Sequence, residues 1–231
     1  MKNCLMSLLS FALVLPLLAG PKVSILGDSY STFEGIIPKG NWIWYYNPPN
    51  NKNDVTKMSE CWWSQVITNL NGKLERNESW SGATICSTGY DGKDFSSFSF
   101  VARAGKLGDP DVILVCGGTN DSWAKSPIGE YKYSDWTAED LKSFRPAMAK
   151  MCHDLQAKYP KAKMWFILND HLSGSINESV HTICKHYKFP CIDLKDVDKQ
   201  KGHPSIKGMR MFADQVTAVV RPALLARKKR P

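Results

Sequence analysis

The sequence lacks several short signatures that would place it in a well-known class of enzyme. It has no P-loop, no dinucleotide-binding glycine fingerprint and no His-Glu-x-x-His pair, so nucleotide-dependent and zinc-protease chemistry have no support. It has no Gly-x-Ser-x-Gly elbow, which argues against an α/β-hydrolase. No Cys-x-x-Cys pair occurs, and a structural zinc site or a thioredoxin-like motif is therefore not indicated. We also find no internal repeat and no low-complexity tract.

Long apolar runs are absent except at the amino terminus. A single lysine precedes residues 4–18, which are almost wholly apolar and end at Ala19-Gly20, as in a secretory signal peptide. The run is shorter than the roughly 20 residues of a comfortable membrane span, although an uncleaved anchor is the alternative. Pro21 lies directly after the expected cut, where proline is unfavourable. Both interpretations export the protein, so we expect a signal peptide at residues 1–20 and a periplasmic or extracellular location.

The chain carries a net charge of +8 and ends in a basic tail at residues 227–231. We interpret the tail as a solvated end, with attraction to anionic polysaccharide or a membrane surface as the alternative. Nucleic acid is not an expected partner of an exported chain without basic motifs interleaved among its aromatics. A membrane is expected only if the amino-terminal segment is an uncleaved anchor, and the sequence does not define an oligomeric state.

Six cysteines follow the amino-terminal segment: Cys61, Cys86, Cys116, Cys152, Cys184 and Cys191. An even number in an exported chain permits disulfides, but the sequence does not select a pairing. Cys184 and Cys191 are near each other in the chain and can close a small loop. Cys116 lies in an apolar run, where a buried thiol is expected.

Apolar strand-like runs alternate with helical patterns along the rest of the chain. Strands are predicted at residues 22–26, 74–80, 112–116, 164–168 and 191–194. Helices are predicted at residues 60–70, 137–158, 175–187 and 205–225. Thr137, followed three residues later by Asp140, is the expected N-cap of the second helix. This alternation predicts a parallel sheet with helices on both faces.

Small or polar residues follow the predicted strands, at the edge where such a sheet binds its ligands. Ser29 follows the first strand, Gly82 the second and Asn120 the third. A free serine is a poor nucleophile and needs a base. His203, before the last predicted helix, can return to the same edge and exchange a proton with Ser29. Taken alone, each of these residues is also typical of a turn or a helix cap.

Negative charge develops on the carbonyl oxygen during acyl transfer, and N–H groups fixed in advance must meet it. The backbone N–H groups of Ser29 and Gly82 and the side-chain amide of Asn120 are candidates for this oxyanion hole. Glycine allows the backbone a close approach to a substrate.

Together these residues resemble the SGNH (GDSL-like) hydrolases, a family named for its Ser, Gly, Asn and His blocks. The matching segments are Gly27-Asp28-Ser29-Tyr30-Ser31, Ser81-Gly82-Ala83-Thr84, Gly117-Gly118-Thr119-Asn120-Asp121 and His203-Pro204-Ser205. The resemblance implies a flavodoxin-like three-layer α/β/α sandwich with a central parallel sheet over residues 21–226. It also implies a shallow open site and ester hydrolysis without a metal or an organic cofactor.

One position departs from the family pattern. The family usually has an acidic residue three positions before the histidine, and this chain has Gln200 there. A carboxylate at that place orients the imidazole and stabilises its charged form. Asp198 is our candidate for a substitute acid. A carboxylate or carbonyl from elsewhere, or a Ser–His dyad, are the alternatives.

Aromatic residues cluster soon after the first block: Trp42, Trp44, Tyr45 and Tyr46. Their polar, loop-like surroundings favour a role in stacking on sugar rings, with core packing as the alternative. We therefore expect a secreted serine esterase that hydrolyses O-acyl esters of carbohydrate, O-acetyl above all. The other hypotheses are a lipid or thioester hydrolase, an acyltransferase, and a non-catalytic glycan-binding protein on a hydrolase fold.

Overall fold

The computed structural model describes residues 20–48 and 53–226. The predicted basic tail, and the predicted signal peptide apart from Gly20, lie outside the described residues. Five strands form one parallel sheet in the order β2-β1-β3-β4-β5. They are β1 (Lys22–Gly27), β2 (Lys73–Asn77), β3 (Val112–Cys116), β4 (Lys163–Leu168) and β5 (Cys191–Asp193). This strand order is the flavodoxin-like one, so the predicted fold is confirmed.

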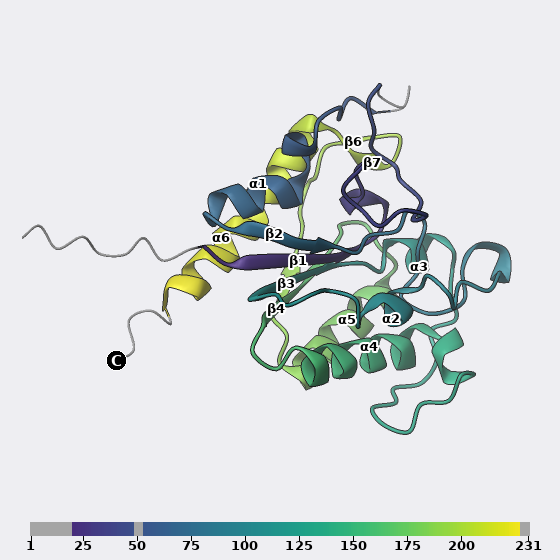
Figure 1. Ribbon diagram of the computed structural model, residues 1–231. Coiled ribbons are helices and arrows are strands. Elements are labelled where there is room, and N and C mark those ends of the chain that lie inside the picture. Colours follow the sequence, from purple (N-terminus) through teal and green to yellow (C-terminus); the bar gives the residue numbers. More distant parts are fainter. Residues whose placement is uncertain (1–19, 49–52, 227–231) are drawn as a thin grey trace, which may run out of the picture.

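Helices cover both faces of this sheet (Figure 1). One face packs against α1 (Trp62–Asn69) and α6 (Ile206–Leu225), and the other against α2 (Phe100–Arg103), α4 (Phe144–Lys158) and α5 (Gly174–Tyr187). Strand β3 shows why both faces are apolar. Its alternate residues Val112 and Leu114 join the α1–α6 core, whereas Ile113 and Val115 join the other core. No helix among the described residues is long and apolar enough to cross a membrane.

Helix α4 begins later than the sequence predicts. Its N-cap is Ser143, and Thr137 lies in the preceding loop. The expected capping pair does form, because the Asp140 carboxylate accepts hydrogen bonds from the backbone N–H and hydroxyl of Thr137, each at 2.7 Å. Pro146 favours the later start, since proline lacks an N–H and is best accommodated in the first turn of a helix. It is the third residue of α4, whereas in a helix that started at Thr137 it would disrupt the interior.

A short hairpin that the sequence pattern does not predict precedes α6. Its strands are β6 (Lys199–Gln200) and β7 (His203–Pro204), paired antiparallel with Gln200 opposite His203. The two residues of the turn, Lys201 and Gly202, have φ values of 51° and 80°. Two consecutive positive φ values match the tight turn that best joins twisted antiparallel strands, and glycine adopts this backbone without strain.

Arg103, at the end of α2, ties together the segments that leave β1 and β2. It is 1% exposed, and its guanidinium donates to the carbonyl oxygens of Phe98 (2.7 Å), Gly27 (3.2 Å) and Glu78. Burial lowers the pKa of Arg103 to about 10, so it stays charged at neutral pH. The carbonyl groups of Gly27 and Glu78 lie shortly before Ser29 and Gly82, respectively. Arg103 therefore supports two of the segments that carry the predicted site.

We expect Arg103→Leu to lower the free energy of unfolding by about 3 kcal/mol, because buried carbonyl groups lose their donor. Urea denaturation followed by circular dichroism measures the change. Arg221→Leu is the matched control, since Arg221 is exposed on α6, and it should leave the unfolding free energy nearly unchanged. Equal stability of the two variants would contradict the role given to Arg103.

Candidate active site

The structure brings the predicted nucleophile and base together. Ser29 begins a short 3-10 turn (Ser29–Ser31) directly after β1, and the Asp28 carboxylate caps this turn by accepting the N–H of Tyr30 at 3.0 Å. His203 Nε2 lies 2.9 Å from Ser29 Oγ. The two side chains come from opposite ends of the chain, and both residues are less than a tenth exposed.

The second nitrogen of His203 faces a backbone carbonyl rather than a carboxylate. Its Nδ1 lies 3.3 Å from the carbonyl oxygen of Lys201, across the hairpin turn. A carbonyl oxygen can only accept a hydrogen bond, so this contact places the proton on Nδ1. Nε2 then carries the lone pair that faces the Ser29 hydroxyl, which is the tautomer that a general base requires.

The substitute acid suggested by the sequence does not contact His203. The Asp198 carboxylate accepts a hydrogen bond from the Ser205 hydroxyl, which also caps α6. The Gln200 amide does not hold the ring either, because it exchanges two hydrogen bonds of 3.0 Å each with Asp54. Among the alternatives for the missing acid, the described residues therefore support a carbonyl, that of Lys201.

Four aromatic rings surround the imidazole of His203, with Tyr45 the most distant at 6.5 Å between centroids. Trp44 stacks on the imidazole with ring centroids 3.6 Å apart and an angle of 8° between the planes. Tyr30 and Trp123 meet it edge-on, with centroids at 5.3 and 6.2 Å. Burial, partly offset by the Lys201 carbonyl, lowers the pKa of His203 to about 4. The ring is thus neutral, and able to accept a proton, at every pH well above that value.

The three predicted oxyanion donors follow β2, β1 and β3, which are adjacent strands. Within the described residues, the backbone N–H groups of Ser29 and Gly82 donate to no protein acceptor. Asn120 uses one amide hydrogen on the carbonyl of Ala83 at 3.0 Å and keeps the other. A buried backbone N–H normally has a partner, so the free N–H of the buried Ser29, beside the free donors of Gly82 and Asn120, indicates a place for an external acceptor.

Neighbouring groups fix the orientation of Asn120. Its Oδ1 accepts the hydroxyl of Tyr90 at 2.7 Å, so its amide nitrogen must face the other way. The adjacent Asp121 carboxylate accepts the backbone N–H groups of Ile85 and Cys86 at 2.8 to 3.2 Å. Burial nevertheless raises the pKa of Asp121 to about 6. These contacts join α3 (Thr119–Trp123) to the loop that carries Gly82. No sequence pattern marks Tyr90 as part of the site.

The four aromatics predicted to bind substrate have different environments. Trp42 is 71% exposed and available to a ligand. One face of Trp44 is covered by His203, and Tyr46 is half-buried. The expectation for Tyr45 is wrong: it is buried, and its hydroxyl donates to the Pro204 carbonyl at 3.0 Å, which anchors the hairpin. Trp123, which was not among the four, is 43% exposed at the edge of His203.

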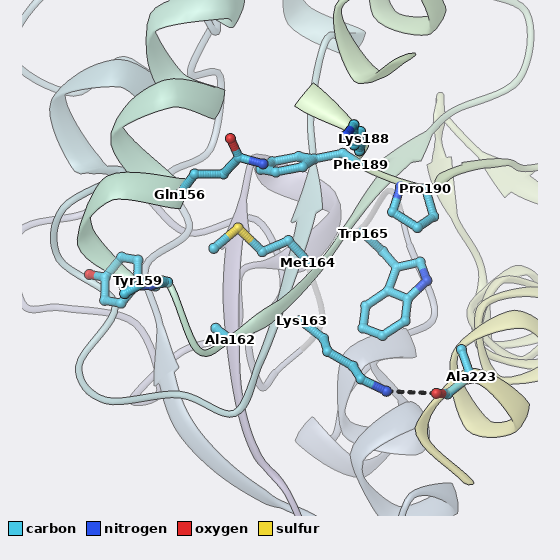
Figure 2. A pocket seen from close by; sticks show the side chains of 11 residues that line it. Gln156, Tyr159, Ala162, Lys163, Met164, Trp165, Lys188, Phe189, Pro190 and Ala223 are labelled. Carbon is cyan, nitrogen blue, oxygen red and sulfur yellow. Dashed lines mark hydrogen bonds between the residues drawn. The ribbon is translucent and has the colours of Figure 1, made fainter. Parts of the chain in front are cut away.

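A cavity of about 470 Å³ lies at the opposite end of the sheet (Figure 2). It is lined by the start of β4, the turn at Lys188–Pro190, the end of α4 and Ala223 of α6. It forms where β5 is too short to pair with β4, since only Phe166–Leu168 have partners there. Its walls include Met164, Trp165 and Phe189 but no serine, cysteine, histidine or carboxylate. We therefore assign no ester chemistry to this cavity.

Comparisons with known proteins agree with this geometry. A family model described as GDSL-like lipase/acylhydrolase matches residues 21–220. A GDSL-like lipase from Bacteroides ovatus is 50% identical, with 87% of this chain and 98% of that chain covered and a TM-score of 0.86. One from Bacteroides uniformis is 49% identical, with 88% and 96% covered and a TM-score of 0.86. No match was found among curated proteins.

A more distant structure shares the fold. A family two carbohydrate esterase from Clostridium thermocellum, solved in complex with cellohexaose, is 18% identical. The similarity covers 88% of this chain and 64% of that chain, with a TM-score of 0.60. At this identity the likeness concerns the fold alone.

We expect kcat/KM for a chromogenic acetate ester to fall on the acid side with a midpoint at about pH 4, because only neutral His203 accepts the serine proton. An ordinary histidine would place that midpoint at about pH 6.5. In Trp44→Ala water reaches one face of the ring, so the midpoint should move up toward the ordinary value. Initial rates measured from about pH 3 to pH 8 test both statements.

Trp42→Ala is the control for that series, since Trp42 is exposed and no ring contact joins it to His203 among the described residues. Its acid midpoint should match that of the parent. A parent midpoint near the ordinary histidine value would refute the effect of burial.

Proposed function

This chain belongs to the GDSL-like lipase/acylhydrolase family and is a carboxylic ester hydrolase, and we propose that it removes O-acyl groups, above all O-acetyl groups, from carbohydrate. The observation that carries the proposal is the 2.9 Å contact between Ser29 Oγ and His203 Nε2. Nucleophile and base are already within hydrogen-bond reach, with unpaired N–H donors on the neighbouring segments.

In the proposed mechanism Ser29 Oγ attacks the ester carbonyl while His203 Nε2 takes the hydroxyl proton. The carbonyl oxygen becomes negative and is held by the N–H groups of Ser29 and Gly82 and the free amide hydrogen of Asn120. His203 then returns the proton to the oxygen of the departing sugar, which leaves an acyl group on Ser29. Water, activated by His203 in the same way, releases the acid and restores the serine.

The Lys201 carbonyl holds the Nδ1 proton of His203 throughout these steps. It fixes the tautomer and the plane of the ring, as a carboxylate does in a Ser-His-Asp triad, but it brings only a partial negative charge. The carbonyl thus contributes to the stabilisation of the imidazolium that forms during each proton transfer.

Two exposed aromatics support carbohydrate as the alcohol part of the substrate. Trp123 meets His203 edge-on, and the Trp42 carbonyl accepts the N–H of Ser81, directly before Gly82. Trp42 and Trp123 therefore lie next to different parts of the proposed machinery, and their exposed rings offer apolar faces to a sugar. The carbohydrate esterase that was solved with cellohexaose shares this fold. Residues 4–18 support export, and we place the reaction outside the cytoplasm.

We expect p-nitrophenyl acetate to be hydrolysed with a kcat/KM at least about tenfold higher than p-nitrophenyl octanoate. The described sheet edge carries indole rings and short polar groups rather than an aliphatic channel. On an acetylated oligosaccharide, Trp123→Ala should raise KM, because a stacking face is lost. The same variant should leave p-nitrophenyl acetate hydrolysis within about twofold, since that ester has no sugar to stack.

Trp136→Ala is a matched control, because Trp136 packs against His153 on the α4 side of the sheet. It should leave KM on both substrates unchanged. A preference for octanoate would favour the lipid hypothesis. Retention on the oligosaccharide without turnover of either ester would favour the non-catalytic one.

A further inference from the structure

A second cluster of reactive side chains lies at the far edge of the sheet, on α5 and β5. His181 and Cys184 are three residues apart on α5, and Cys191 and Asp193 are two apart on β5. Positions three apart on a helix share one face, as do positions two apart on a strand. Each of these two consecutive elements therefore carries a pair of side chains that can bind a metal ion.

The end of α5 brings the two pairs into contact. Lys188 has a left-handed φ of 58°, and the N–H groups of Lys188 and Phe189 close the helix on the carbonyls of Lys185 and Cys184. The chain then reverses within the three residues Lys188–Pro190 and enters β5. This tight reversal brings Cys191 beside Cys184.

The donor atoms are already grouped at short range. His181 Nε2 lies 3.3 Å from Asp193 Oδ1, and Cys191 Sγ lies 3.6 Å from the same oxygen. Ligand atoms of His181, Cys191 and Asp193 all lie within 4.8 Å of one another. In a tetrahedron with metal–ligand bonds of about 2.0 to 2.3 Å, neighbouring ligands are separated by about 3.3 to 3.8 Å.

We propose that His181, Cys191 and Asp193 bind one divalent transition-metal ion, with the neighbouring Cys184 as the candidate fourth ligand, and that Zn²⁺ is the ion this donor set fits. Two sulfur atoms, one imidazole nitrogen and one carboxylate oxygen are the donor types that zinc accepts in tetrahedral sites. The expectation of no zinc site was based on the absence of Cys-x-x-Cys, whereas this cluster uses a helix spacing and a strand spacing instead.

The residues of this cluster differ in their burial. Cys184 is 2% exposed and belongs to the core beneath α5, whereas His181 and Asp193 are half-exposed at the rim.

A disulfide between Cys184 and Cys191 is the competing fate of the two thiols in an exported protein. Both are free in the structure, as are the other four cysteines after the amino-terminal segment. A disulfide does not explain why His181 and Asp193 lie beside Cys191. A metal ion that is bound by these side chains does explain it. The site would anchor β5, which is the edge strand and only three residues long.

Co²⁺ titration of reduced residues 20–231 tests the proposal, because cobalt bound by thiolates absorbs in the visible and near ultraviolet. We expect one Co²⁺ per chain, with thiolate charge-transfer and tetrahedral bands that Zn²⁺ abolishes, and a higher Tm with Zn²⁺. Cys191→Ser and Asp193→Asn should each weaken Co²⁺ affinity at least about tenfold. Esterase activity should be unchanged, since two strands separate β5 from β1.

His186→Ala is the control, because His186 is on the same helix but stacks on Tyr133 with ring centroids 3.8 Å apart. It should keep full Co²⁺ affinity. Circular dichroism of each variant separates loss of the site from loss of the fold. Absence of the cobalt bands in folded parent protein would overturn the proposal. So would unchanged affinity in Cys191→Ser, or a linked Cys184–Cys191 peptide in mass spectra of protein exported without reductant.

Discussion

The hydrogen bond between His203 Nε2 and Ser29 Oγ joins residues 174 positions apart, and the remaining site depends on it. The parallel sheet fixes the serine at the carboxyl end of β1. Gly27 allows the Ser31 side chain to pack against the end of β1, since a Cβ at position 27 would lie 2.6 Å from it. The turn at Lys201–Gly202 fixes the histidine, and the Tyr30 hydroxyl ties this turn back to the serine segment through the Gly202 carbonyl at 2.6 Å.

Among the described residues, His203 Nδ1 thus contacts the Lys201 carbonyl where a Ser–His pair usually has a carboxylate. A carbonyl can orient an imidazole, but it offers less charge than a carboxylate when the ring becomes protonated. The pKa of His203, lowered to about 4 by burial, agrees with this lack of a charged partner. Trp44, stacked on the imidazole, contributes to this burial.

The sheet could be predicted from the alternating apolar runs, and the closeness of Ser29 and His203 from the sequence blocks that resemble the family. The parts that escaped prediction depend on contacts without a side-chain signature. Any residue supplies a carbonyl, so nothing in Lys201 marks it as the partner of Nδ1. Four neighbouring aromatics looked equivalent, yet packing on the hairpin buries Tyr45, exposes Trp42 and stacks Trp44 on the base.

The most direct test of the central claim is the rate of p-nitrophenyl acetate hydrolysis by residues 21–231, measured beside Ser29→Ala and His203→Ala. If the two residues act as one catalytic unit, each variant should lose about 10³-fold or more of the parent activity. The double variant should then be hardly slower than either single one. Equal rates in the parent and both variants, each shown to be folded, would contradict the assignment of Ser29 and His203.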